Sequence, residues 1–165
     1  MRALKTIIIG TGGFARHHLR VILAAPRRTR VVGLVEPHPE SREKTRVFFE
    51  EKGQSCPPFY DSIAELIRTQ GRPEAALICS PHKFHYEHAR ACLMNGMDVC
   101  LEKPMVMNVS EATRLIRLRD RTGRLLTVAF PGSFSPAVRK ARQMIARGVI
   151  GRVTAVEGYV HQGWQ

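Results

Sequence analysis

A glycine-rich turn lies directly behind an apolar segment near the beginning of the sequence. Three isoleucines at 7–9 lead into Gly10-Thr11-Gly12-Gly13-Phe14-Ala15, which opens a helix-like segment. In this G-x-G-x-x-A pattern the first glycine permits a tight turn, the second permits a close backbone approach, and the small sixth residue lets the helix pack on the strand. The start of the helix also leaves unpaired N–H groups that can hold a phosphate. The segment therefore predicts a strand–turn–helix unit, and an α/β fold around it.

Strand-like and helix-like segments alternate from there to residue 129. Apolar strands are expected at 6–9, 31–35, 75–78, 99–101 and 125–129. Helices are expected at 14–24, 41–52, 62–71, 84–95 and 110–121. Ser62 and Ser110 are the expected capping residues of two of these helices. Because such alternation is typical of a parallel sheet buried on both faces, residues 1–129 are predicted to form a doubly wound α/β domain of the Rossmann type.

The pattern changes after residue 129. A loop at 131–136 precedes an expected helix at 137–147, and a strand-like run follows at 153–160. Residues 130–165 are therefore predicted to begin a second unit.

Glu36 ends the second expected strand, about 20 residues beyond the turn, where an acid accepts hydrogen bonds from the ribose hydroxyls of a dinucleotide. A carboxylate there repels the 2′-phosphate of NADP, so NAD is favoured over NADP, although Arg42 is close enough in sequence to complicate the choice. Two alternatives stay open: a glycine turn and a surface glutamate without a ligand, and a methyltransferase site, which combines the same features. The residues predicted here to bind the dinucleotide are Gly10, Thr11, Gly12, Gly13, Phe14 and Glu36.

Basic residues outnumber acidic ones, since 26 Lys and Arg stand against 14 Asp and Glu, a formal net charge of +12. A basic surface attracts anions, including nucleic acid. The arginines are nevertheless spread along the chain, and Arg114, Arg117 and Arg121 have the spacing of one solvated helix face. No zinc-finger or RNP-like pattern accompanies them, so nucleic acid is disfavoured as a partner.

Metal and membrane classes are also disfavoured. The four cysteines lack the spacing of a zinc site and are expected to be buried thiols, so no metal site is predicted. No stretch approaches the roughly 20 apolar residues of a membrane span, and the apolar run at 7–9 is too short for a signal peptide. A cytoplasmic protein is expected.

Two further polar segments follow expected strands, at the sheet edge where open α/β folds bind their ligands. One runs from Cys79 to His85, and the other is Glu102-Lys103-Pro104. A lysine beside a nicotinamide ring could serve as general acid or base for a hydroxyl group that is oxidised. A solvated Glu102–Lys103 ion pair is the alternative, and the spacing alone does not decide between the two.

With these motifs, the sequence resembles the Gfo/Idh/MocA oxidoreductases, a family that includes glucose–fructose oxidoreductase and inositol dehydrogenase. The resemblance runs from residue 5 to residue 156 and rests on the glycine turn, Glu36, Ser80-Pro81 with His85, and above all Glu102-Lys103-Pro104. Many families share the glycine turn, whereas a Glu-Lys-Pro motif behind a Ser/Thr-Pro-x-x-x-His segment is far more specific.

The resemblance implies an NAD(P)-dependent dehydrogenase that transfers hydride between the nicotinamide and a sugar, cyclitol or similar small hydroxy or carbonyl compound. Lys103 would be the catalytic lysine and assist proton transfer. Glu102 would contact the nicotinamide side, and Pro104 would follow a cis peptide bond. The residues that would lie along the cofactor near its nicotinamide end are Ser80, Pro81 and His85. The full-length form would be a homo-oligomer.

Two features depart from the family pattern. Gly132 and Ser133 stand where basic residues are usual, ahead of the matching Phe134-Ser135-Pro136. Family members are also much longer, and the resemblance implies that residues 130–165 are the incomplete beginning of their second, α+β domain, which binds substrate and mediates oligomerisation. In the family that domain supplies a catalytic histidine, a role for which His161 is a poor candidate because its position fits an ordinary strand residue. We therefore expect cofactor binding with little or no turnover by this chain.

A non-catalytic dinucleotide-binding module, acting as a sensor or as a subunit of an assembly, is the alternative function. It would keep Gly10, Gly12 and Glu36 but would give Lys103 no chemical role.

Overall fold

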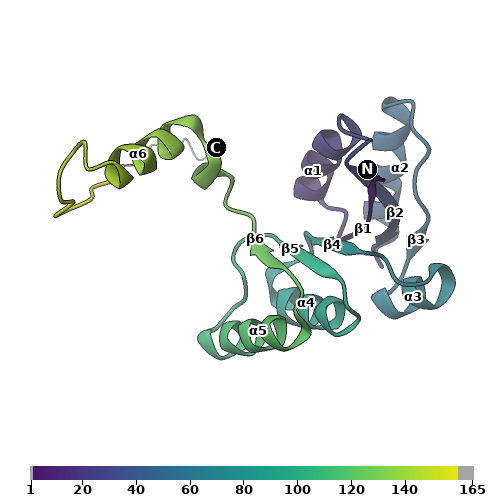
Figure 1. Cartoon of the computed structure of the whole chain (residues 1–165). Helices are drawn as coiled ribbons and strands as arrows, with labels where there is room; N and C mark the ends of the chain where they lie inside the picture. Colours follow the sequence, from purple (N-terminus) through teal and green to yellow (C-terminus); the bar gives the residue numbers. More distant parts are fainter. Residues whose placement is uncertain (1, 160–165) are drawn as a thin grey trace. The chain divides into compact units, whose positions relative to one another are not determined.

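The computed structural model describes residues 2–159. Six strands form one parallel sheet in the order β3-β2-β1-β4-β5-β6 (Figure 1). They are β1 (Leu4–Ile9), β2 (Thr29–Val35), β3 (Phe59–Tyr60), β4 (Ala75–Ile78), β5 (Asp98–Leu101) and β6 (Leu126–Val128). The strand order reverses between β1 and β4, and in open α/β sheets the ligand crevice lies at this reversal, outside the carboxyl ends of the strands. The predicted doubly wound Rossmann fold is confirmed.

Helices cover both faces of the sheet. They are α1 (Gly13–Leu23), α2 (Pro39–Glu51), α3 (Ile63–Gln70), α4 (His85–Met94) and α5 (Val109–Thr122), and a short 3₁₀ turn, η1 (His82–Phe84), precedes α4. The central strand shows how the core divides: Ile7 and Ile9 pack with α3, α4 and α5, whereas Ile8 packs with α1 and α2. Successive side chains of a strand point to opposite faces, so this apolar strand serves two core layers at once.

The β3 strand is shorter than its neighbour and was not expected from the sequence. It pairs only with Leu34 and Val35, and no other described strand pairs with the first part of β2 on that side. Pro57 and Pro58 precede β3, and because proline has no backbone N–H, this stretch cannot continue an ordinary ladder along β2. The two apolar residues that follow were too short a run to indicate a strand.

Helix capping was predicted correctly at α3 and wrongly at α5. The Ser62 side chain accepts a hydrogen bond from the backbone N–H of Glu65, as expected. At α5 the cap is Asn108 rather than Ser110, because the Asn108 side chain accepts from the N–H of Glu111 at 2.9 Å. Asparagine caps as well as serine does, and starting two residues earlier gives the helix an additional half turn.

The chain divides into two compact units, Met1–Ala129 and Phe130–Gln165. Within the described part of the second unit are a 3₁₀ turn, η2 (Pro131–Phe134), and a helix, α6 (Pro136–Ala146), whose start is capped by the side chain of Ser135. The strand expected at 153–160 does not form over 153–159, where the described residues of this unit offer no strand to pair with. Val160 and His161 lie outside the described residues.

The cysteines are free thiols. Cys92 is buried and the other three are partly buried, in line with the expected buried thiols. Burial raises the pKa of both Cys79 and Cys92 to about 12, so these thiols are poor nucleophiles. None of the helices in the described residues combines the length and the apolar character needed to cross a bilayer.

Candidate functional site

The turn after β1 packs tightly against the loop after β4. Gly10 has a φ of +82°, and a Cβ atom placed on it would lie 2.6 Å from the Cα of Ser80. Both the backbone conformation and the lack of space require glycine here. The backbone N–H of Gly10 also donates to the carbonyl of Val35 at the end of β2. The first glycine of the motif therefore brings three strand ends together at the carboxyl edge of the sheet.

The start of α1 is open and has no capping side chain. Gly12 is the N-cap residue, and no acidic side chain lies in the first turn. A Cβ atom on Gly12 or Gly13 would meet no atom of the described part of the chain within 4 Å. The unpaired N–H groups and the positive end of the helix dipole therefore lie beside free space. These are the features that a helix start needs in order to hold the pyrophosphate of a dinucleotide.

Glu36 is buried at the end of β2, with its carboxylate fixed by backbone groups. One oxygen accepts from the backbone N–H of Thr11 at 2.9 Å and from its hydroxyl at 3.3 Å, and the other accepts from the N–H of His38 at 3.0 Å. Thr11 itself is completely buried, so its contact is with Glu36 rather than with the open space above the turn. An ionised carboxylate offers about four acceptor positions, so Glu36 keeps capacity for a ligand hydroxyl.

Glu102 and Lys103 follow β5 but do not pair with each other. The Oε1 atom of Glu102 lies 2.6 Å from the Nε2 atom of His18 on α1, and no salt bridge of Lys103 occurs within residues 2–159. The Lys103 ammonium instead lies 5.3 Å from the centre of the Phe14 ring. The proposed alternative of a solvated Glu102–Lys103 ion pair is therefore not what the structure contains. The Lys103–Pro104 peptide bond is cis, as the resemblance implied.

His85 connects the two polar segments. It is completely buried, its Nδ1 atom lies 2.8 Å from the carbonyl oxygen of Pro104, and its Nε2 atom lies 2.9 Å from that of Ser80. The ring therefore lies within hydrogen-bond distance of both loops, and its contacts hold the loops after β4 and β5 against each other. The Ser80 hydroxyl bonds to Nδ1 of His88, and burial, followed by the charge of His85, lowers the pKa of His88. Pro81 is exposed beside this loop.

Sequence reasoning missed His18 and His88. Their ring nitrogens hold Glu102 and Ser80, two residues that it had singled out. A signal for His18 was available, because it comes four residues after Phe14 and so lies on the same face of α1. His88 had no comparable signal, since its partner is reached only when α4 folds back against the loop that precedes η1.

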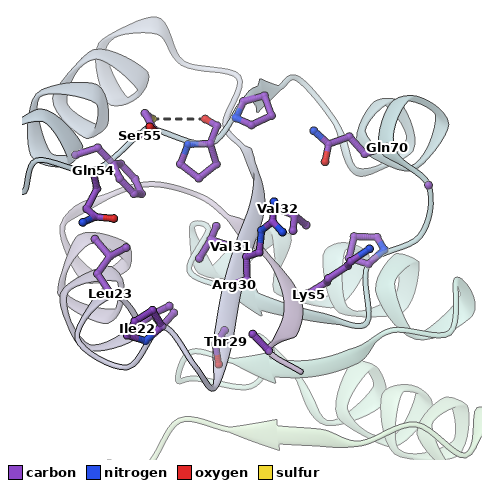
Figure 2. Close-up of a pocket in the computed structure, with 18 of the residues that line it drawn as sticks. Lys5, Ile22, Leu23, Thr29, Arg30, Val31, Val32, Gln54, Ser55 and Gln70 are labelled. Carbon is purple, nitrogen blue, oxygen red and sulfur yellow. Dashed lines mark hydrogen bonds between the residues drawn. The ribbon is translucent and has the colours of Figure 1, made fainter. Parts of the chain in front are cut away.

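A cavity of about 740 Å³ lies at the opposite edge of the sheet, around the uncovered first part of β2. Figure 2 shows Lys5 and Val32 on the side that faces Gln70, and Val31 on the side that faces Leu23.

The charged residues that line this cavity are all basic: Lys5, Arg30 and Arg72. Neither the glycine turn nor any of the acids discussed above contributes to it. Its size therefore does not mark the site that the sequence motifs predict.

Comparison with known proteins gives a consistent result. A family model described as "Oxidoreductase family, NAD-binding Rossmann fold" matches residues 4–130. The D-glucoside 3-dehydrogenase of Escherichia coli is 30% identical over 82 residues, which are 50% of this chain and 23% of that protein.

Two solved structures show the same fold. The scyllo-inositol dehydrogenase of Lactobacillus casei, with bound NAD(H) and scyllo-inositol, has a TM-score of 0.79 at 20% identity, over 93% of this chain and 44% of that one. The WlbA dehydrogenase of Bordetella pertussis, in complex with NADH and UDP-GlcNAcA, has a TM-score of 0.80 at 22% identity, over 92% and 44%. The chain thus spans less than half the length of these proteins.

Proposed function

Because the chain belongs to the Gfo/Idh/MocA oxidoreductase family, we propose that it binds NAD at the carboxyl edge of its sheet and presents Lys103 to a substrate hydroxyl or carbonyl group. The observation that carries this proposal is the meeting of three features at the strand reversal: the uncapped start of α1, the fixed carboxylate of Glu36, and an ammonium group that pairs with no carboxylate of residues 2–159. Together they supply a phosphate site, a ribose site and a proton carrier.

The adenosine half of the dinucleotide would be held by groups that are already in position. The first-turn N–H groups of α1 would receive the pyrophosphate in the space beside Gly12 and Gly13. Glu36 would accept from a ribose hydroxyl, and the two backbone N–H groups that hold it fix its orientation before any ligand arrives. A site that needs little rearrangement loses less conformational entropy on binding.

The surroundings of Glu36 support NAD rather than NADP. A second anion beside this buried carboxylate would be repelled. Arg42, the first arginine after Glu36 in the sequence, is engaged elsewhere, since its guanidinium donates to the backbone carbonyl of Glu36 and to the carboxylate of Asp61. A 2′-phosphate would therefore have to break the Arg42 contacts in order to gain a counter-charge.

Lys103 is the proposed catalytic residue. The bound nicotinamide would supply the hydride chemistry, because no side chain can accept or donate hydride in its place. Lys103 would take the proton from the substrate hydroxyl, or return it to the carbonyl oxygen, at its Nζ atom. The Phe14 ring beneath the ammonium stabilises its position without neutralising it, as a carboxylate would.

Sugars and cyclitols are the proposed substrates. Support comes from the similar proteins, of which one is a D-glucoside dehydrogenase and another was solved with scyllo-inositol. Because the chain spans less than half the length of these proteins, we propose cofactor binding for the chain itself, and substrate turnover and homo-oligomer formation only for a full-length form. A non-catalytic dinucleotide-binding module would share the cofactor site but not the role of Lys103.

The test is a calorimetric titration of the chain with NADH and, in parallel, NADPH at fixed salt. We expect saturable NADH binding, weaker NADPH binding, and a loss of at least about tenfold in NADH affinity in Gly12→Val, whose side chain would fill the space for the pyrophosphate. Gly132→Val, in the second unit, is the matched control and should bind as the wild type does. A folded wild-type protein that binds neither dinucleotide would refute the proposal.

A further inference from the structure

Two side chains of α1, one helical turn apart, contact the Glu102–Lys103 segment. Residues at i and i+4 lie on the same helix face, so Phe14 and His18 are neighbours. The Phe14 ring lies under the Lys103 ammonium at 5.3 Å, and the Nε2 atom of His18 lies 2.6 Å from Oε1 of Glu102. One face of α1 therefore reaches both Glu102 and Lys103.

Glu102 depends on this contact because it is buried. The residue is only 8% exposed, and among residues 2–159 its second carboxylate oxygen has a single, longer bond, from the backbone N–H of Lys103 at 3.2 Å. Burying a carboxylate without a hydrogen-bond donor lowers the stability of the folded protein, so a buried carboxylate pairs with a donor that lies within reach. An ionised carboxylate can only accept, and the imidazole of His18 is a donor group within its reach at 2.6 Å.

The backbone around Glu102 is held separately. The N–H of Glu102 donates to the carbonyl of Ile78 on β4, and His85 bonds to the carbonyl of Pro104. With both ends of the segment fixed, the direction of the Glu102 carboxylate is set by its side-chain partner. The charged group next in sequence that could replace His18 is the ammonium of Lys103.

We propose that His18 is a positioning residue, which holds the Glu102 carboxylate away from Lys103 and directed to the nicotinamide end of the bound cofactor. Without the imidazole, Glu102 pairs with the adjacent Lys103 ammonium, so that the acid is displaced and the lysine is neutralised in one step. The inference rests on the proposed cofactor site, since it assigns a role within that site.

The experiment compares two ligands on the same variants. ADP-ribose carries the adenosine, pyrophosphate and second ribose of NADH but no nicotinamide. In His18→Ala we expect NADH binding to weaken about tenfold, the size of effect expected for a lost bond to a charged group, while ADP-ribose binding stays within about twofold of the wild type. His18→Gln, whose amide can donate to the carboxylate, should restore most of the NADH affinity. His17→Ala, at the exposed neighbouring position, is the control and should leave both affinities unchanged.

A spectroscopic readout follows the lysine without any ligand. After reductive ¹³C-methylation, the signal of Lys103, assigned through Lys103→Arg, should move in His18→Ala and keep its wild-type position in His18→Gln and His17→Ala. Equal losses for NADH and ADP-ribose in His18→Ala, or a Lys103 signal that does not move, would overturn the positioning role while leaving the cofactor site intact. A wild-type chain that binds neither ligand would refute the proposed function itself, and the role of His18 with it.

Discussion

The two edges of the sheet are built from the same strands but hold very different sets of groups. At the carboxyl edge, acids and histidines come together from several elements, and each of those described has a hydrogen-bonding partner, as Glu36 has in Thr11 and Glu102 has in His18. At the amino edge a cavity of about 740 Å³ opens around β2, and its charged lining residues are cations only. The comparison teaches that polar groups which come together from several elements and bond to one another are a better guide to the candidate site than the volume of a cavity is.

The largest expected effect is a difference in stability between variants of two glycines at the carboxyl edge. Gly10→Val should lower the free energy of unfolding by more than about 3 kcal/mol, because its Cβ would collide with the Ser80 backbone and its φ is positive. Gly12→Ala, which enters open space, should stay within about 1 kcal/mol of the wild type. Urea denaturation followed by circular dichroism measures both, and equal stability of the two variants would show that the turn can move away from the β4 loop.

The next effect concerns His85 at the same edge. His85→Leu removes a buried ring that lies within hydrogen-bond distance of two carbonyl oxygens, those of Ser80 and Pro104, so we expect a loss of about 2–4 kcal/mol in unfolding free energy. NADH affinity should fall as well, since the loops after β4 and β5 lose their connection. The matched control is His82→Leu, an exposed histidine of η1, which should change neither quantity by much. A His85→Leu protein as stable as this control would mean that water replaces the ring.

The smallest effect belongs to the amino edge. Lys5 and Arg30 are register partners on neighbouring strands, and like charges placed side by side in a sheet are destabilising. Arg30→Gln should therefore raise stability by up to about 0.5 kcal/mol and leave NADH affinity unchanged, whereas Arg27→Gln, in the preceding turn, should have no effect on either. If Arg30→Gln lowered NADH affinity in the calorimetric titration, the amino edge would also take part in cofactor binding, and the proposed difference between the two edges would be wrong.

Most of the fold of the first unit could be predicted because its strands are apolar runs between helices. The isoleucines of β1, for example, admit few positions other than the centre of a sheet buried on both faces. The β3 strand could not be predicted, since two residues behind Pro57-Pro58 form a strand only when β2 is already present to pair with them. The prediction of a strand at 153–159 was wrong for the opposite reason. These residues favour a strand, but the described part of the second unit provides no strand to pair with them.

The candidate site was predictable in its residue types and less so in its contacts. Gly10 and Glu36 follow from a spacing that the chemistry of dinucleotides imposes. The partner of Glu102 could not be read in the same way, because adjacency in sequence suggested Lys103, whereas folding brings His18 closer. Local motifs point to candidate groups, and tertiary packing decides which of them are paired.

The uncovered part of β2 has a consequence for how copies of this chain meet in solution. An open strand edge can pair with the same edge of another copy, which is a route to aggregation. Here the edge is bordered by Arg30 and by the proline pair at 57–58, and Lys5 lies on the adjoining strand. Two such edges would bring four cations together, in a protein whose net charge is already +12. The repulsion that costs the sheet a little stability thus also works against edge-to-edge association.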